Sequence, residues 1–283
     1  MKTRIITAIV ALCVFVPILI FADTPALPIG IAFCAVVAVY EMLNCVGLKK
    51  SVAVSVPFYL CAAAFPFLIR YLPDGAKYGW RTFAVAAVLL TMLYLFAVLI
   101  FSKGKYKVPD VATAFFGILY VLIGLFAILY VRDKVEGGKY IYLIAFIGAW
   151  VTDTFAYFCG ILFGRGGKHK LIPEVSPKKT VEGSVGGILF CVAAMVLFGF
   201  IVEKIDASFH PNYWVLALGG LVISAVAQIG DLAMSVVKRH YGIKDYGFLF
   251  PGHGGILDRF DSVIAVSVFL VVLTSFFRIF EVI

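Results

Sequence analysis

The sequence predicts an all-α integral membrane protein, a polytopic bundle of about nine transmembrane helices. Of its 283 residues, 63% are hydrophobic and only 14% are charged, whereas soluble domains average about 45–50% apolar and about 25% charged residues. The mean hydropathy is +1.05. Apolar runs recur along the whole chain at close to the roughly 20 residues that a helix needs to cross a bilayer. These observations exclude a soluble globular domain.

The first apolar run, residues 5–21, follows Lys2 and Arg4 and so has the layout of a signal peptide. However, it is longer than the roughly 7–15 apolar residues of a typical signal peptide, and no clear small-residue cleavage site follows. We therefore predict the first transmembrane helix here. Later runs are similar in length, although Pro57 and Pro66 interrupt the third. The predicted spans are 5–21, 28–45, 52–71, 83–101, 111–131, 141–163, 185–201, 214–232 and 262–280.

The distribution of Lys and Arg predicts a cytosolic N-terminus. With alternating spans, sixteen of the 24 basic residues fall on the N-terminal side of the membrane and eight on the other, and cytosolic segments carry such an excess. The two longest polar segments, 164–184 and 233–261, then both face the cytosol. We predict N-terminal transmembrane helices over 1–135 and a catalytic membrane region over 136–283. The formal net charge of +8 fits membrane lipids and an anionic substrate, and we expect no nucleic-acid partner.

The last cytosolic segment contains carboxylates suited to a metal ion. Asp231 ends the eighth predicted span, and Asp258 and Asp261 are three residues apart, so they share one face if a helix begins at Leu257. Oxygen ligands of this kind suit Mg²⁺. A single acid here would be explained more simply by the helix dipole or by an ion pair with Lys238. Three acids among so many basic residues and glycines predict a metal site.

Basic residues and glycines in the same segment predict phosphate binding. Cations neutralise phosphate charge during its transfer, although they could also anchor the chain at the bilayer surface. Anchoring explains less well the turn at 252–255, where Gly254 and Gly255 allow backbone N–H groups to approach an anion. His253 either binds a phosphate or caps this turn. The polar residues concerned are Ser235, Lys238, Arg239, Lys244 and Arg259.

The segment around 150–187 contains a second set of polar residues. Asp153 lies within the sixth predicted span, where an acid is costly and usually functional. Gly160 and Gly164 have the spacing of a helix-packing seam. Two hydroxyls and two cations then precede a glycine-rich helix start, which predicts a close backbone approach there. These residues are Ser176, Lys178, Lys179 and Thr180.

The stretch SVVKRHYGIKDYGFLFPGHGGILDRFD, residues 235–261, resembles the motif of the phosphatidate cytidylyltransferase (CDP-diacylglycerol synthase) family. The shared pattern is Ser, a gap, Lys-Arg, four residues, Lys-Asp, then Pro, His-Gly-Gly and Asp-Arg-x-Asp, without a departure. SPKKTVEG at 176–183 and DTFAYFCGILFGR from Asp153 are similar to the same family. The motifs cover the C-terminal half, whereas the N-terminal half agrees only in its hydrophobic helices.

The resemblance implies transfer of CMP from CTP to phosphatidic acid with Mg²⁺, yielding CDP-diacylglycerol and pyrophosphate, in a bacterial inner membrane with the active site facing the cytosol. It leaves open a second metal or a monovalent cation, and assembly as a homodimer. Asp231, Asp258 and Asp261 would hold metal. The phosphate-contacting and catalytic residues would be Lys238, Arg239, Lys244, Arg259 and His253, and the substrate-binding residues Ser176, Lys178, Lys179, Thr180, Ser235, Gly254 and Gly255.

Two other functions compete with this interpretation. A CTP-dependent kinase or cytidylyltransferase acting on a polyprenol or archaeal-type lipid would share most of this chemistry. An ion-coupled transporter would use Asp153 and Asp231 as a relay, but it needs a polar path to the outer face, whereas the acids and glycines gather on one side. A purely structural membrane subunit would leave the charged segment unexplained.

Overall fold

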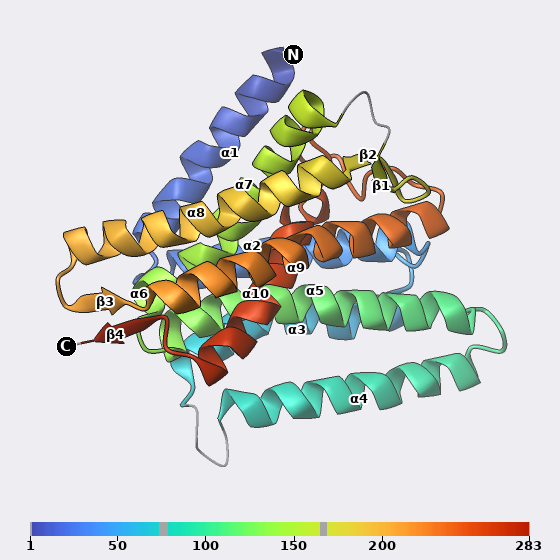
Figure 1. The fold of residues 1–283 in the computed structure, drawn as a ribbon. Coiled ribbons are helices and arrows are strands. Elements are labelled where there is room, and N and C mark those ends of the chain that lie inside the picture. Colours follow the sequence, from blue (N-terminus) through green and yellow to red (C-terminus); the bar gives the residue numbers. More distant parts are fainter. Residues whose placement is uncertain (1, 74–78, 165–168, 283) are drawn as a thin grey trace. The chain divides into compact units, whose positions relative to one another are not determined.

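The computed structural model describes residues 2–73, 79–164 and 169–282, and it consists of helices with two short strand pairs (Figure 1). Within those ranges, eight segments are long and apolar enough to cross a membrane, which confirms the predicted polytopic helical class. The predicted first span lies in α1, whose apolar part, Ile9–Ile20, is shorter than the other eight. The helices are α1 (Lys2–Ile20), α2 (Ala26–Cys45), α3 (Val52–Tyr71), α4 (Trp80–Phe101), α5 (Val108–Lys134), α6 (Gly138–Ile141), α7 (Leu143–Phe163), α8 (Val181–Ile205), α9 (Tyr213–His240) and α10 (Leu257–Phe276).

The chain divides into two compact units, each described by itself. Unit 1 comprises residues 1–129 and 241–259, and unit 2 comprises residues 130–240 and 260–283. The predicted functional boundary after residue 135 stays a prediction. The count of basic residues that predicts the orientation includes Lys77, Arg165 and Lys168, which lie outside the described residues.

Unit 1 is a series of neighbouring helices. α1 packs on α2, α2 on α3 and α3 on α4. α3 continues through Pro57 and Pro66, as membrane helices can when neighbouring groups satisfy the freed carbonyls. In α4 the buried side chains are Thr91 and Leu95, so most of this helix presents apolar side chains outward, as a lipid-facing helix does.

Unit 2 is organised around three helices, α7, α8 and α9, that pack against one another (Figure 1). Glycines permit the close approach of α7 and α8. A Cβ atom on Gly187 would lie 2.9 Å from the Thr152 carbonyl oxygen, and one on Gly160 would lie 3.1 Å from Thr180 Oγ1. The predicted packing seam at Gly160 and the predicted close approach at the start of α8 are therefore confirmed, and the partner in both cases is protein.

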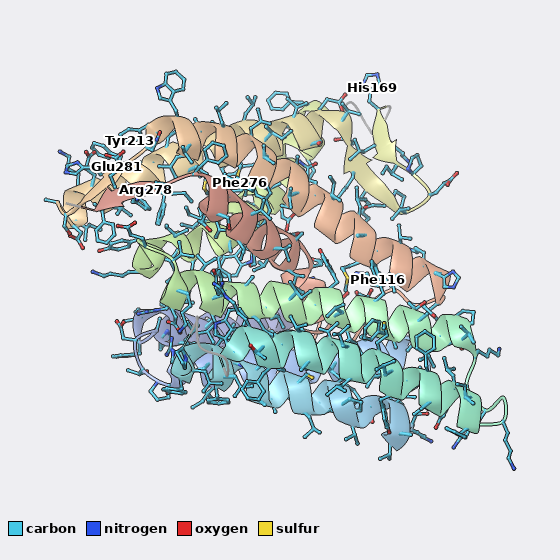
Figure 2. The ribbon with its side chains drawn as sticks, turned by 90° about the horizontal axis from the view of Figure 1, so that it is seen from below. Phe116, His169, Tyr213, Phe276, Arg278 and Glu281 are labelled. Atoms are coloured by element: carbon cyan, nitrogen blue, oxygen red, sulfur yellow. The ribbon has the colours of Figure 1, made fainter. Side chains whose placement is uncertain are left out.

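Two antiparallel strand pairs that we did not predict lie at different ends of unit 2. β1 (Lys170–Ile172) pairs with β2 (Ser176–Thr180), and β3 (Phe209–Pro211) pairs with β4 (Phe280–Val282). Figure 2 shows His169 beside the first pair, and Tyr213, Arg278 and Glu281 at the far end near the second.

The last helix begins earlier than the predicted span 262–280. α10 starts at Leu257 and ends at Phe276, which places Asp258 in its first turn. After α10 the chain becomes extended, and Phe280 packs edge-on against Phe209 with ring centroids 6.0 Å apart. Hydropathy alone could not distinguish these apolar strand residues from a continuing helix.

Candidate active site

Three polar side chains lie on one face of α9 in unit 2. Asp231, Ser235 and Lys238 follow at intervals of four and three residues, and this spacing aligns side chains along a helix. Ser235 and Lys238 are buried, and the Ser235 hydroxyl lies 3.5 Å from Asp231 Oδ1. The predicted continuation of this face from Asp231 to Lys238 is confirmed.

The β1–β2 hairpin brings a cation to this face. Lys179 Nζ lies 2.5 Å from Asp231 Oδ2, whereas Lys178, next to it on β2, is exposed. Alternate residues of a strand point to opposite sides, so only one of the two lysines reaches α9. At the end of the strand, the Thr180 hydroxyl accepts a 3.1 Å hydrogen bond from the Gly183 N–H, which caps α8.

Two further carboxylates approach from α7 and α10. The Ser262 hydroxyl donates to Asp153 Oδ2 at 2.9 Å, and the Ser262 N–H donates to Asp261 Oδ1 at 2.9 Å. Asp261 also interacts electrostatically with Asp231, Asp153 and Lys238. Unit 2 therefore gathers three carboxylates from α7, α9 and α10, which we call the acidic cluster: Asp153, Asp231 and Asp261.

The acidic cluster has the chemistry of a divalent-cation site. Three carboxylates face two lysines, Lys179 and Lys238, so full ionisation leaves an excess of negative charge, and carboxylate oxygens are the ligands that Mg²⁺ prefers. Side chains of His, Cys, Asp and Glu in the described ranges do not, however, form a ready metal-binding group of three or more. The predicted metal role of Asp231, Asp258 and Asp261 stays a prediction.

In unit 1, Asp258 stabilises the segment before α10. Its Oδ2 atom accepts hydrogen bonds from the Tyr246 N–H at 2.8 Å and the Gly255 N–H at 3.0 Å. Between these points the chain makes a tight turn, in which the Phe250 N–H donates to the Gly254 carbonyl at 2.9 Å. Asp258 therefore organises the glycine-rich turn.

Glycines are necessary in this turn for two reasons. Gly252 and Gly254 have φ values of 80° and 84°, in the left-handed region that glycine adopts most readily. A Cβ on Gly254 would also lie 2.7 Å from Asp258 Oδ2. The predicted turn at 252–255 is confirmed, and the backbone N–H of Gly255 is directed to protein, at Asp258.

The remaining predicted site residues differ in exposure. His253 and Ser176 are half-buried, and Lys244, Arg239 and Arg259 are exposed.

Sequence reasoning missed one buried acid. Glu41, in the second predicted span, is 2% exposed and accepts hydrogen bonds from the Ile256 and Leu257 N–H groups. An acid inside an apolar span was the available signal, and we applied it only to Asp153. Tyr241 is a second missed contact: its hydroxyl lies 3.3 Å from Asp110 Oδ1.

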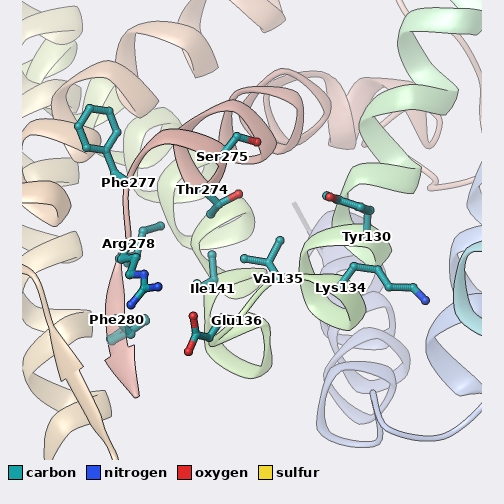
Figure 3. A pocket seen from close by; sticks show the side chains of 11 residues that line it. Tyr130, Lys134, Val135, Glu136, Ile141, Thr274, Ser275, Phe277, Arg278 and Phe280 are labelled. Carbon is teal, nitrogen blue, oxygen red and sulfur yellow. The ribbon is translucent and has the colours of Figure 1, made fainter. Parts of the chain in front are cut away.

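Unit 2 also has a cavity of about 270 Å³ (Figure 3). Its walls include Lys134 at the end of α5 and Thr274 near the end of α10. Thr274 is thirteen residues after Asp261, roughly 20 Å along the helix at about 1.5 Å per residue. The cavity is therefore remote from the acidic cluster. Of its two cations, Lys134 is the last residue of α5 and Arg278 follows the end of α10, and helix C-termini attract positive charge.

Comparison with known proteins identifies the family. Residues 2–277 match the sequence profile described as Cytidylyltransferase family. The phosphatidate cytidylyltransferase of Staphylococcus haemolyticus (strain JCSC1435) is 37% identical over 262 residues, which cover 93% of this chain and 94% of that protein. The protein of the same name from Staphylococcus aureus (strain COL) is 38% identical over 264 residues, with 93% and 94% covered. This chain belongs to the Cytidylyltransferase family.

Proposed function

We propose that the protein is a CTP:phosphatidate cytidylyltransferase that makes CDP-diacylglycerol for phospholipid synthesis. The similarity to phosphatidate cytidylyltransferases over 93% of the chain is the observation that carries this proposal. A phosphate oxygen of phosphatidate attacks the α-phosphorus of CTP. The bond from that phosphorus to the α–β bridging oxygen breaks, and pyrophosphate leaves.

The side chains of unit 2 support this chemistry. The lipid phosphate is already an anion, so the reaction needs no Ser, Cys or His nucleophile, and catalysis consists of positioning and neutralising two anions. Lys179 and Lys238 lie beside the acidic cluster and would neutralise phosphate charge. Arg239 of unit 2 is exposed and would add a further positive charge for a nucleotide. Lys244 and Arg259, in unit 1, are exposed as well, and their phosphate contacts stay predictions.

Asp231 and Asp261 of unit 2 would hold Mg²⁺, which would supply charge neutralisation at the phosphates. The metal role of Asp258, in unit 1, stays a prediction from the sequence. In the absence of substrate, Lys179 pairs with Asp231, which offsets part of the repulsion among the carboxylates. We infer that Lys179 turns from Asp231 to a phosphate of CTP when the cation binds. Ser262 holds Asp153 through a 2.9 Å hydrogen bond and so keeps the third carboxylate in place.

The membrane setting supports a lipid substrate. Asp153 is exposed although it lies within a predicted span, and an acid at that depth is stable only where it faces water or a polar partner. A lipid headgroup that enters from the side, together with Mg²⁺ and CTP, would provide polar partners for Asp153. We propose that this end of the helices faces the cytosol of a bacterial inner membrane, as the excess of basic residues predicts.

The decisive experiment measures pyrophosphate release and CDP-diacylglycerol formation by purified protein in detergent. With CTP, Mg²⁺ and phosphatidate, we expect both products in equal amounts, and we expect loss of both when EDTA removes the metal. ATP in place of CTP, and polyprenol or polyprenyl phosphate in place of phosphatidate, serve as controls. Turnover of CTP with a polyprenyl substrate but not with phosphatidate would overturn the proposed acceptor.

A further inference from the structure

Glu41 is a buried carboxylate far in sequence from the motifs at 176–183 and 235–261. It lies near the C-terminal end of α2, and its side chain is 2% exposed. A buried carboxylate is costly unless it is hydrogen-bonded. Its partners in unit 1 are the backbone of the segment that precedes α10, more than 200 residues later in the chain.

The hydrogen bonds of Glu41 are directed at the first turn of α10. Glu41 Oε1 accepts from the Ile256 N–H at 3.0 Å, and Oε2 accepts from the Leu257 N–H at 2.9 Å. N–H groups at a helix start have no partner within the helix, and a negative charge there is favoured by the helix dipole. Both oxygens of one carboxylate thus fix the point at which α10 begins.

The Glu41 carboxylate packs closely against two glycines of the segment. A Cβ atom added to Gly247 would lie 2.8 Å from Glu41 Cδ, and one added to Gly255 would collide with the same carboxylate. The two glycines enclose the carboxylate from both ends of the turn. Glu41 and Asp258 together accept four backbone N–H groups of the segment 246–257.

We propose that Glu41 is a positioning residue for the reaction: it holds segment 246–257 and the start of α10 in the geometry that presents His253, Asp258 and Arg259 to the substrates. Glu41 itself is enclosed by backbone and does not touch substrate. The proposal rests on the proposed function for its kinetic consequences, but the ordering of the segment can be measured without substrate.

The first test compares Glu41→Gln with the wild-type enzyme in detergent. Gln keeps one acceptor oxygen but turns an N–H₂ group toward a backbone N–H, so the segment loosens. We expect kcat to fall about 10- to 100-fold, because a small misplacement of reacting groups slows a reaction by such factors. We also expect KM for CTP to rise. Hydrogen exchange at the Ile256 and Leu257 amides should accelerate in the absence of any substrate.

A matched control separates positioning from general destabilisation. Met42→Ala, at the next residue of α2, removes a fully buried side chain of unit 1 whose far end lies beside Gly117, and it leaves the Glu41 carboxylate unchanged. It should lower the melting temperature at least as much as Glu41→Gln. Its kcat per folded molecule, its KM for CTP and its exchange at Ile256 and Leu257 should remain those of the wild type.

Gly247→Ala tests the same contact from the other side and covers the case in which Glu41→Gln fails to fold. The added methyl group displaces the carboxylate, and we expect the same pattern of kcat, KM and exchange. In a Glu41→Ala background the methyl group has space, so Gly247→Ala should then cost little more, a non-additive result. Gly117→Ala, whose added methyl group would lie nearest to the flexible Met42 side chain, 3.0 Å from its Cε, should be close to neutral.

Two outcomes would overturn the proposal. One is wild-type kcat, KM and exchange in folded Glu41→Gln or Gly247→Ala. The other is a loss of kcat no greater than the loss of folded protein, with unchanged exchange in the segment. If instead the wild-type enzyme shows no turnover of CTP with phosphatidate, the proposed function fails, while accelerated exchange in Glu41→Gln would still support the anchoring of the segment.

Discussion

The carboxylates of the two units differ in what they bind. In unit 1, Glu41 and Asp258 accept hydrogen bonds from backbone N–H groups of one segment. In unit 2, Asp153 and Asp231 contact a serine hydroxyl and a lysine ammonium group, and Asp261 accepts one N–H, that of the next residue, Ser262. Backbone partners are fixed once the chain folds, whereas side-chain partners can exchange for a metal ion or a phosphate. Glu41 therefore maintains a geometry, Asp258 combines that role with its predicted metal role, and the acidic cluster has partners that a ligand can replace.

The largest expected effect is that of Asp261→Asn in the acidic cluster. It removes a charge from the proposed Mg²⁺ site, and we expect kcat to fall on the order of a thousandfold. The melting temperature should stay unchanged or rise, because the substitution relieves repulsion from Asp153 and Asp231. Kinetics with CTP and phosphatidate and a thermal melt on the same sample check both parts. Turnover near that of the wild type would remove Asp261 from the site.

Asp258→Asn should affect both activity and stability. Asn keeps one acceptor oxygen but weakens two charge-assisted hydrogen bonds to the Tyr246 and Gly255 N–H groups. We expect the free energy of unfolding to fall by about 1–3 kcal/mol and kcat to fall about a hundredfold. Comparison of its melting curve with that of Asp261→Asn tests the difference between the units. Equal stability of the two variants would contradict it.

Lys179→Met should have a smaller effect, confined to the nucleotide. Removal of the ammonium group beside Asp231 should raise KM for CTP about tenfold, because one phosphate contact is lost. Lys178→Met is the matched control, because Lys178 is the next residue on the strand and its side chain is exposed. It should raise KM for CTP less than Lys179→Met does. The difference between the variants should shrink at high salt if Lys179 acts through its charge. If Lys178→Met raised KM for CTP more than Lys179→Met, the phosphate contact would belong to Lys178 instead of Lys179.

The smallest expected effect is a change in stability at alkaline pH that comes from the titration of Tyr241. Burial, together with the negative charge of Asp110, raises the pKa of Tyr241 above its ordinary value. The folded state therefore favours the neutral phenol. Its contribution to stability is complete below the unfolded pKa, at about pH 10, and is lost as pH rises through the folded pKa.

Tyr241→Phe removes the 3.3 Å hydrogen bond to Asp110 and should lower stability by about 1 kcal/mol or less near neutral pH. The difference from the wild type should decrease above about pH 10. Melting temperatures of both proteins from pH 7 to 11, in steps of about half a unit, test this titration. A constant difference across that range would show that Tyr241 does not titrate differently in the folded protein.

Much of the candidate site was visible in the sequence because it depends on local spacing. Asp231, Ser235 and Lys238 share a face of α9 since their intervals match the helical repeat. The turn at 252–255 could be predicted from its glycines, which adopt positive φ. The strand pairs could not, because strands of three to five residues are too short to show a periodic pattern.

The sequence by itself determined the membrane class and the approximate positions of most spans, since hydropathy and helical periodicity act over neighbouring residues. Only the tertiary structure decided which acidic side chains accept hydrogen bonds from backbone N–H groups. Glu41 and Leu257 are bonded across more than 200 residues, and Lys179 rather than Lys178 meets Asp231. Such pairings depend on how distant helices pack, and no local pattern in the chain specifies that packing.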